Sequence, residues 1–182
     1  MSQTAITHAM TVDVEDYYHV AAFAKVIKPS EWNNWPSRVE QNTERLLQLF
    51  ADHNIKITFF ILGWVAEKYP QLVKTIHQQG HEIASHGFSH QLIYNQTPEV
   101  FRAETAKSKQ LLEDLTQTPV NGYRAASYSI TRKSLWALDI LADLGFTWDS
   151  SIFPTRHDNY GIPGSPEEPY QIITTNGTKL LE

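Results

Sequence analysis

Residues 57–62 read ITFFIL, an apolar run broken only by Thr58, and this stretch decides the fold class. Such a run is typical of a strand that is buried on both faces of a parallel sheet. We expect a helix next, from about Pro70 to Gln79, because Pro70 stands near its start and Gly80 follows its end. HEIAS, residues 81–85, predicts a second short strand. The stretch therefore has the strand–helix–strand order of a parallel sheet.

The same alternation continues on both sides of this unit. Toward the N-terminus, residues 9–14 (AMTVDV) predict a strand and residues 37–53 a helix, with Ser37 and Glu40 as its capping box. Toward the C-terminus, we expect helices at about 97–115 and 131–144, and strands at 121–125, 146–150 and 170–175. About five such steps predict an α/β fold with a mainly parallel sheet. Ligand sites in these folds gather at the carboxyl ends of the strands.

Two of these helices have a recognisable apolar face. The spacing along the chain places Val39, Thr43, Leu46 and Phe50 on one side of the first helix, and Val100, Leu111, Leu112 and Leu115 on one side of the helix at 97–115. We expect these faces to pack on the sheet.

Length and composition limit the classes of protein that this chain can belong to. With 182 residues, it fits one domain covering residues 1–182. The apolar share of 41%, with five Trp, eight Tyr and eight Phe, is enough for a packed core and excludes a disordered chain. The net charge of −5 and the lack of a Lys/Arg cluster argue against a nucleic-acid partner. Without Cys, disulfides, thiol nucleophiles and Cys-ligated metals are excluded.

Targeting segments and common nucleotide motifs are also missing from the sequence. The start, MSQTAITHAM, has neither a basic nor an apolar leader region, and no stretch approaches about 18 apolar residues. We therefore expect a cytoplasmic chain without a transmembrane segment. The sequence has no GxGxxG, GxxxxGK[ST] or GxSxG pattern, which disfavours nucleotide-dependent chemistry and a serine hydrolase.

An acidic cluster follows the first expected strand. Asp13, Glu15 and Asp16 place three carboxylates within four residues, and these charges repel one another unless they are solvated or share a cation. Strand alternation puts Asp13 and Glu15 on the same side. On its own, such a cluster is more often a solvated surface than a metal site.

A histidine cluster follows the strand at 81–85. His86 and His90 are four residues apart, a spacing that places two imidazoles on one face of a helical turn. Two His and one carboxylate give a three-ligand metal site with open positions. An isolated pair of this kind is more often two surface histidines, but its place after a strand favours metal binding. His81 precedes the strand, and we interpret it as structural.

Two further strand ends carry polar side chains. Arg124 follows the strand at 121–125, and a buried Arg pairs with a carboxylate, so it either orients Asp13 or ties two loops together. Asp149 is followed by two Ser residues. This pattern is typical of a turn or cap, but it adds a polar group to the same rim of the sheet.

The sequence resembles the polysaccharide deacetylases of the NodB-homology type, carbohydrate esterase family four. The most specific match is GHEIASHGFSH, residues 80–90. The acidic strand end, the Arg–Tyr motif at 124–128 and the Asp at 149 occur in the same order as in that family. TVDVEDYYHV (11–20) and DSSIFPTRHDNYGIP (149–163) resemble the subgroup found with exosortase-type exopolysaccharide loci. The resemblance runs from about residue 10 to the end. It implies a distorted (β/α) barrel of about seven strands.

The resemblance also implies roles for single residues. Asp13 takes the place of the general base, Arg124 that of the residue that orients it, and His86 and His90 those of the metal-binding pair. Val14 stands where the family has its metal-binding Asp. The carboxylate ligand is then Glu15 or Asp16, with a slight preference for Asp16.

The remaining motifs match less closely. Tyr128 stands near the Tyr whose backbone N–H binds the oxyanion, four residues after Arg124 instead of three. Asp149 matches the Asp that orients a general-acid His, and the motif carrying that His lies beyond residue 182. His157, the one later His, lacks the expected context.

The resemblance implies a hydrolase that uses Zn²⁺ or another divalent metal to remove N-acetyl groups from an amino-sugar polysaccharide, an exopolysaccharide in this subgroup. Two alternatives stay open on the same fold. One is an amidase of small ring amides, similar to allantoinases and imidases. The other is a carbohydrate-binding protein without catalytic activity.

Overall fold

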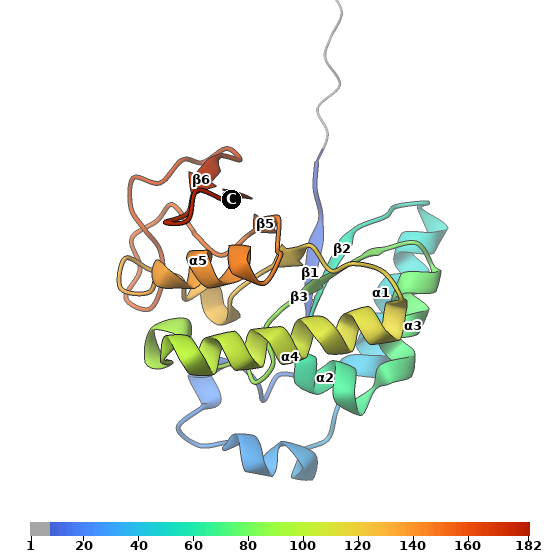
Figure 1. Cartoon of the computed structure of the whole chain (residues 1–182). Helices are drawn as coiled ribbons and strands as arrows, with labels where there is room; N and C mark the ends of the chain where they lie inside the picture. The colour runs from blue at the N-terminus through green and yellow to red at the C-terminus, as the bar shows by residue number, and fades with distance from the viewer. Residues whose placement is uncertain (1–7) are drawn as a thin grey trace, which may run out of the picture.

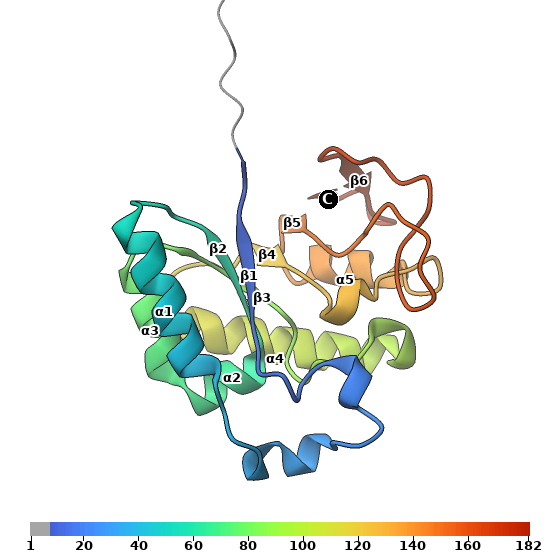
Figure 2. The same ribbon diagram turned by 180° about the vertical axis from the view of Figure 1, so that it is seen from behind.

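The computed structural model describes residues 8–182, and its centre is a seven-stranded sheet (Figures 1 and 2). The strands are β1 (Thr11–Val14), β2 (Thr58–Ile61), β3 (Glu82–Ser85), β4 (Gly122–Tyr123), β5 (Trp148–Asp149), β6 (Gln171–Ile173) and β7 (Lys179–Leu181). Their order in the sheet is β1-β2-β3-β4-β5-β7-β6. All neighbours are parallel except the pair β6–β7. This confirms the α/β fold and the number of strands.

Residues 8–182 also form five α-helices: α1 (Val39–Asp52), α2 (Gly63–Lys68), α3 (Pro70–Gln78), α4 (Pro98–Thr116) and α5 (Trp136–Asp143). The longest, α4, contacts α2, α3 and α5 and crosses in front of the strands in Figure 1. Within the described part of the chain, no helix has the length and apolar character needed to cross a bilayer. The expectation of a chain without a leader depends partly on residues 1–7, which lie outside the described residues.

Most of the expected elements are present with shorter bounds. The helix expected at 70–79 is α3, and Gly80 ends it with a positive φ of 81°. The helix expected at 131–144 begins only at Trp136, after a turn. The short helix α2 and the last strand β7 were not predicted.

Two expectations about helix details are wrong. Ser37 and Glu40 form no capping box, because the Ser37 hydroxyl donates to Asp16 instead (2.6 Å). On α4, Val100 is 44% exposed and the neighbouring Phe101 is buried. The face expected on α1 is confirmed, because Val39, Thr43 and Phe50 are buried and Leu46 packs against the core beside the more buried Leu47.

The register of the sheet brings the polar strand ends into one line. Across β1 to β5, the paired positions are Val14, Ile61, Ser85, Tyr123 and Asp149. The side chains of Val14, Ile61 and Tyr123 belong to the buried core. Because side chains alternate along a strand, the residue after each of these positions faces the opposite side of the sheet. Sequence-distant polar residues therefore meet beside the carboxyl ends of the strands.

No pairing joins β1 to β6 among residues 8–182, so the sheet is open as described. The barrel that the resemblance implies is present here as a curved sheet of seven strands. The segment between β1 and α1, residues 15–38, lies below the strands in Figures 1 and 2 and carries two short 3₁₀ helices, Ala21–Phe23 and Pro29–Asn34.

Candidate functional site

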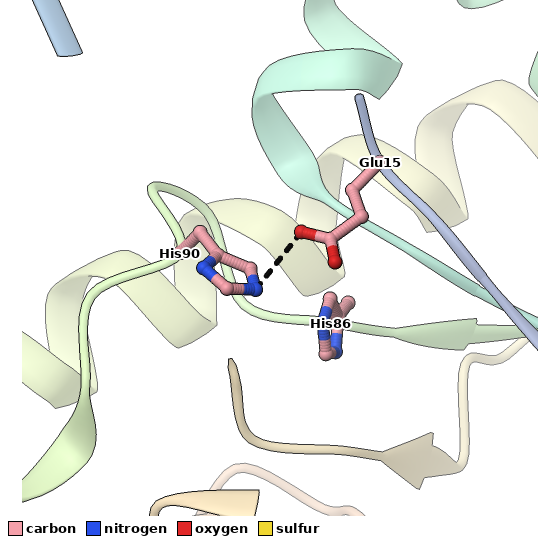
Figure 3. Close-up of side chains that lie close together, drawn as sticks. All are labelled: Glu15, His86 and His90. Carbon is pink, nitrogen blue, oxygen red and sulfur yellow. Dashed lines mark ion pairs between the residues drawn. The ribbon is translucent and has the colours of Figure 1, made fainter. Parts of the chain in front are cut away.

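Three side chains from two strand ends converge in one cluster (Figure 3). One carboxylate oxygen of Glu15 and one ring nitrogen each of His86 and His90 all lie within 4.8 Å of one another. Glu15 follows β1, and His86 follows β3 directly. His90 lies in the next loop with a φ of 52°, so a loop and not a helical turn brings the two imidazoles together. Their ring centroids are 5.3 Å apart.

The protonation of His86 is set by its backbone partner. Its Nδ1 lies 2.8 Å from the carbonyl oxygen of Arg124. A carbonyl only accepts, so Nδ1 carries the proton and Nε2 keeps its lone pair free. Burial lowers the pKa of His86 further than the nearby Asp13 carboxylate raises it. The ring is therefore held neutral, as a metal ligand must be.

The partner of the two histidines is an ionised carboxylate. Burial raises the pKa of Glu15, but His90 and His86 outweigh burial, so that the pKa lies below its ordinary value. Glu15 Oε2 lies 2.9 Å from His90 Nε2, yet it is buried without an aligned hydrogen-bond donor. The carboxylate of Glu15 and the two imidazoles thus face one another across a small buried space, as the ligands of one cation would. Two imidazoles and one carboxylate form the donor set of zinc sites with open positions.

A second network beside the cluster holds Asp13. Arg124 Nη1 donates to Asp13 Oδ1 (2.8 Å) and to Thr11 Oγ1 (3.0 Å), and Nη2 donates to Ser150 Oγ (2.9 Å). The guanidinium also lies 3.9 Å from the centre of the Phe60 ring. Arg124 therefore holds the carboxylate of Asp13, which was the first interpretation of this residue. It also links β1 to Ser150, the residue after β5, in agreement with the second interpretation that it joins two loops. Asp13 Oδ2 stays 4.0 Å from His86 Nε2.

Comparison with known proteins agrees with this arrangement. Residues 31–148, well over half of the chain, match the family model described as polysaccharide deacetylase. The chain belongs to the polysaccharide deacetylase family. A peptidoglycan-N-acetylglucosamine deacetylase of Bacillus cereus is 37% identical over 73 residues, which cover 40% of this chain and 26% of that protein. A peptidoglycan deacetylase of Helicobacter pylori is 30% identical over 123 residues, covering 68% and 41%.

The fold of this chain also matches a solved structure. A crystal structure from Mycobacterium smegmatis assigned to the polysaccharide deacetylases aligns with a TM-score of 0.73 and 24% identity. The alignment covers 95% of this chain and 56% of that one. The chain thus spans less than half of the two relatives above and somewhat more than half of this structural neighbour.

Asp16 has a different place from the one that the sequence favoured. Its Oδ2 accepts from the Ser37 hydroxyl (2.6 Å) and from the backbone N–H of Val39 (3.3 Å), and its Oδ1 accepts from the N–H of Arg38 (3.0 Å). A carboxylate in this position satisfies the free N–H groups at the start of α1 and faces the positive end of the helix dipole. The preference for Asp16 over Glu15 as the metal ligand therefore finds no support in this geometry. Local spacing carries no signal for a cap that comes from more than twenty residues away.

Tyr128 does not present the free donor that its motif suggests. Its backbone N–H donates to the carbonyl of Ala125 (3.0 Å). Ser127 and Tyr128 both have a positive φ, 51° and 52°, a strained conformation for side chains of this size. The oxyanion role of the Tyr128 N–H thus lacks a geometric basis in this conformation.

Asp149 lies in a buried carboxylate pair. Burial and the neighbouring Glu182 raise the pKa of Asp149 well above its ordinary value, although Ser151 Oγ donates to its Oδ1 (2.6 Å). Glu182 Oε1 in turn accepts from the backbone N–H groups of Ser151 and Ile152. His157 is exposed and stacks on Tyr160 at 3.9 Å, so it does not pair with Asp149. No local pattern in the sequence pointed to Glu182 as the partner of Asp149.

Proposed function

We propose that this protein is a metal-dependent N-deacetylase of an amino-sugar polysaccharide. The observation that carries the proposal is the convergence of Glu15, His86 and His90 beside Asp13. A cluster of two imidazoles and one carboxylate next to a second, oriented carboxylate is the arrangement needed to hydrolyse an amide with an activated water.

Glu15, His86 and His90 are the residues that would hold the metal, and Zn²⁺ suits their donor set. When bound there, the cation would supply Lewis-acid polarisation of the acetamide carbonyl and a more acidic water. The fit rests on the ligand atoms of the three residues, which lie within 4.8 Å of one another, and on the free Nε2 of His86.

Asp13 would act as the general base. Arg124 holds Oδ1 of this carboxylate, which leaves Oδ2 to accept the proton of the attacking water. The same Arg124 residue fixes His86 through its backbone carbonyl. One residue would thus position both the base and one metal ligand.

The substrate class follows from the family. Two relatives are named as deacetylases of peptidoglycan, and we infer an N-acetylated glycan for this chain as well. The similarity of residues 11–20 and 149–163 to the exopolysaccharide-locus subgroup supports an exopolysaccharide over peptidoglycan.

The test is to measure bound metal and acetate release on the same protein. Acetate release from N-acetylglucosamine oligomers, lost with a chelator and restored by Zn²⁺, is the expected result. Hydrolysis of allantoin without glycan turnover would favour the ring-amide alternative. Glycan binding without release of acetate by the zinc-loaded protein would make this a carbohydrate-binding protein and overturn the proposal.

A further inference from the structure

A pocket of about 200 Å³ lies between the segment 18–32 and the loop 89–95. It adjoins His90 but contains neither Glu15 nor His86 in its wall. Five of the twelve residues in the wall are aliphatic, namely Ala21, Ala24, Ile27, Pro29 and Leu92. Its volume is well above the roughly 10–15 Å³ that one water needs and below the roughly 300 Å³ of a drug-sized site. It therefore suits one small chemical group.

The wall of this pocket holds an unusual number of polar atoms without a partner. His19 Nε2, Trp32 Nε1 and His90 Nδ1 are all buried, and none of them has a hydrogen-bond partner within the protein. Each of the three residues is less than a tenth exposed. Buried polar atoms normally have partners, so three such atoms on residues of one pocket point to a ligand.

Two of these atoms are hydrogen-bond donors. The backbone N–H of Asp16 donates to His19 Nδ1 (2.9 Å), so Nδ1 accepts and the ring proton lies on Nε2. The indole Nε1–H of Trp32 can only donate. The ring of His19 packs against that of Trp32, with centroids 4.4 Å apart. Both N–H groups belong to residues that line the pocket, and a ligand with an acceptor oxygen would satisfy them.

The ligand should carry no charge. None of the residues lining the pocket is Asp, Glu, Lys or Arg, so a buried ion would have no counter-charge there. The carboxylates of Glu15 and Asp16 lie near His19 and would repel an anion. An amide meets these conditions, because its carbonyl accepts two N–H donors and its methyl group fits the aliphatic wall.

We propose that this pocket binds an uncharged amide, the acetamido group of an N-acetylated sugar, through the N–H groups of His19 and Trp32. The proposal rests on the proposed function in one respect, namely that the amide belongs to the glycan. It assigns the segment between β1 and α1 to substrate recognition and gives the protein a second contact with acetylated sugar beside the metal centre.

The test uses the indole N–H signals of the five Trp residues in ¹⁵N NMR spectra of the metal-free protein. Trp32→Phe removes one signal and so assigns it. Titration with N-methylacetamide should shift the Trp32 signal, whereas sodium acetate should leave it in place. N,N′-diacetylchitobiose should bind more tightly than N-methylacetamide, and chitobiose without acetyl groups should bind more weakly than its diacetylated form.

Trp32→Phe should weaken the affinity for the amide about tenfold, the loss expected for one hydrogen bond in a buried site. Trp35→Phe is the matched control, because Trp35 follows the same 3₁₀ helix but is 41% exposed and lies outside the pocket. An unmoved Trp32 signal, an equal response to acetate, or an equal loss in Trp35→Phe would each overturn the proposal. Because the readout needs neither metal nor turnover, its failure is distinct from failure of the deacetylase proposal.

Discussion

His86 Nδ1 lies 2.8 Å from the backbone carbonyl of Arg124, the residue whose side chain holds Asp13. The ring orientation of His86 therefore depends on the position of β4, and so does the orientation of the Asp13 carboxylate. A metal ligand fixed through its second nitrogen is a common feature of metal sites. Here the atom that fixes the His86 ring is the backbone carbonyl oxygen of Arg124, so substitution of the Arg124 side chain leaves this contact in place.

Replacing either His86 or His90 by Ala should abolish tight zinc binding, because two protein ligands are left. Elemental analysis after dialysis should give about one zinc per chain for the parent protein and nearly none for the variants. His157→Ala is the control, since His157 is exposed and is not part of the cluster. Full zinc content in both cluster variants would contradict the assignment.

Glu15→Gln and Asp16→Asn should separate metal binding from helix capping. Glu15→Gln should lose zinc, because it removes the carboxylate of the cluster. Asp16→Asn should keep zinc and lower the melting temperature, since loss of a charged cap costs about 1 kcal/mol, or roughly 3 °C for a chain of this size. The opposite pattern would return the ligand role to Asp16.

Asp13→Asn should keep zinc and glycan affinity but lose most turnover. General-base catalysis contributes about 10²–10⁴-fold, and the loss should fall on kcat with little change in KM. Arg124→Lys should give a milder defect of the same kind, because Lys keeps the charge but not the paired N–H groups. Steady-state kinetics on acetylated oligomers, with Arg102→Lys as the surface control, would measure both effects. Loss of zinc in Asp13→Asn would make this residue a ligand instead.

His19 should make the protein less stable in mild acid. Burial lowers the pKa of His19 from 6.5 to about 4, against the opposing effect of the nearby carboxylates. His19 is therefore protonated near pH 6.5 in the unfolded chain but only near pH 4 in the folded chain. The free energy of unfolding falls as the pH drops through this window. The full effect of one such histidine is about 3 kcal/mol.

His19→Asn isolates this contribution, because the Asn carbonyl can accept from the Asp16 N–H without taking up a proton. Urea denaturation between pH 7 and 4 should show a smaller loss of stability in the variant than in the parent protein. Parallel curves for the two proteins would show that His19 titrates normally in the folded state.

Sequence reasoning located the elements that are defined by local pattern. ITFFIL became the buried strand β2, and Pro70 and Gly80 bound α3 as expected. The helix α2 was missed because its six residues are too few to show a helical period. The sequence also showed polar residues at the strand ends, such as Glu15 and His86, and the parallel register of the sheet explains why they lie close together.

The details that failed are those set by contacts between distant residues. Asp16 was favoured as a ligand because the family has an Asp in its first motif, but a helix start more than twenty residues later uses its carboxylate. The partner of Asp149 is Glu182, which follows β7 and which local pattern could not connect to it. The unpaired donors of His19 and Trp32 likewise emerge only when two separate segments pack together.

The line of paired positions from Val14 to Asp149 has a consequence for redesign and for natural variation. One residue inserted or deleted within β1 would exchange Asp13 and Glu15 with their apolar neighbours Val12 and Val14, and so turn the acids into the core. Residues 17–36 are free of this constraint, because they follow the paired strand and lie between Asp16 and Ser37, which are joined by a hydrogen bond. Their length can therefore change, and with it the pocket that they line, while Asp13, Glu15 and the two histidines stay in place.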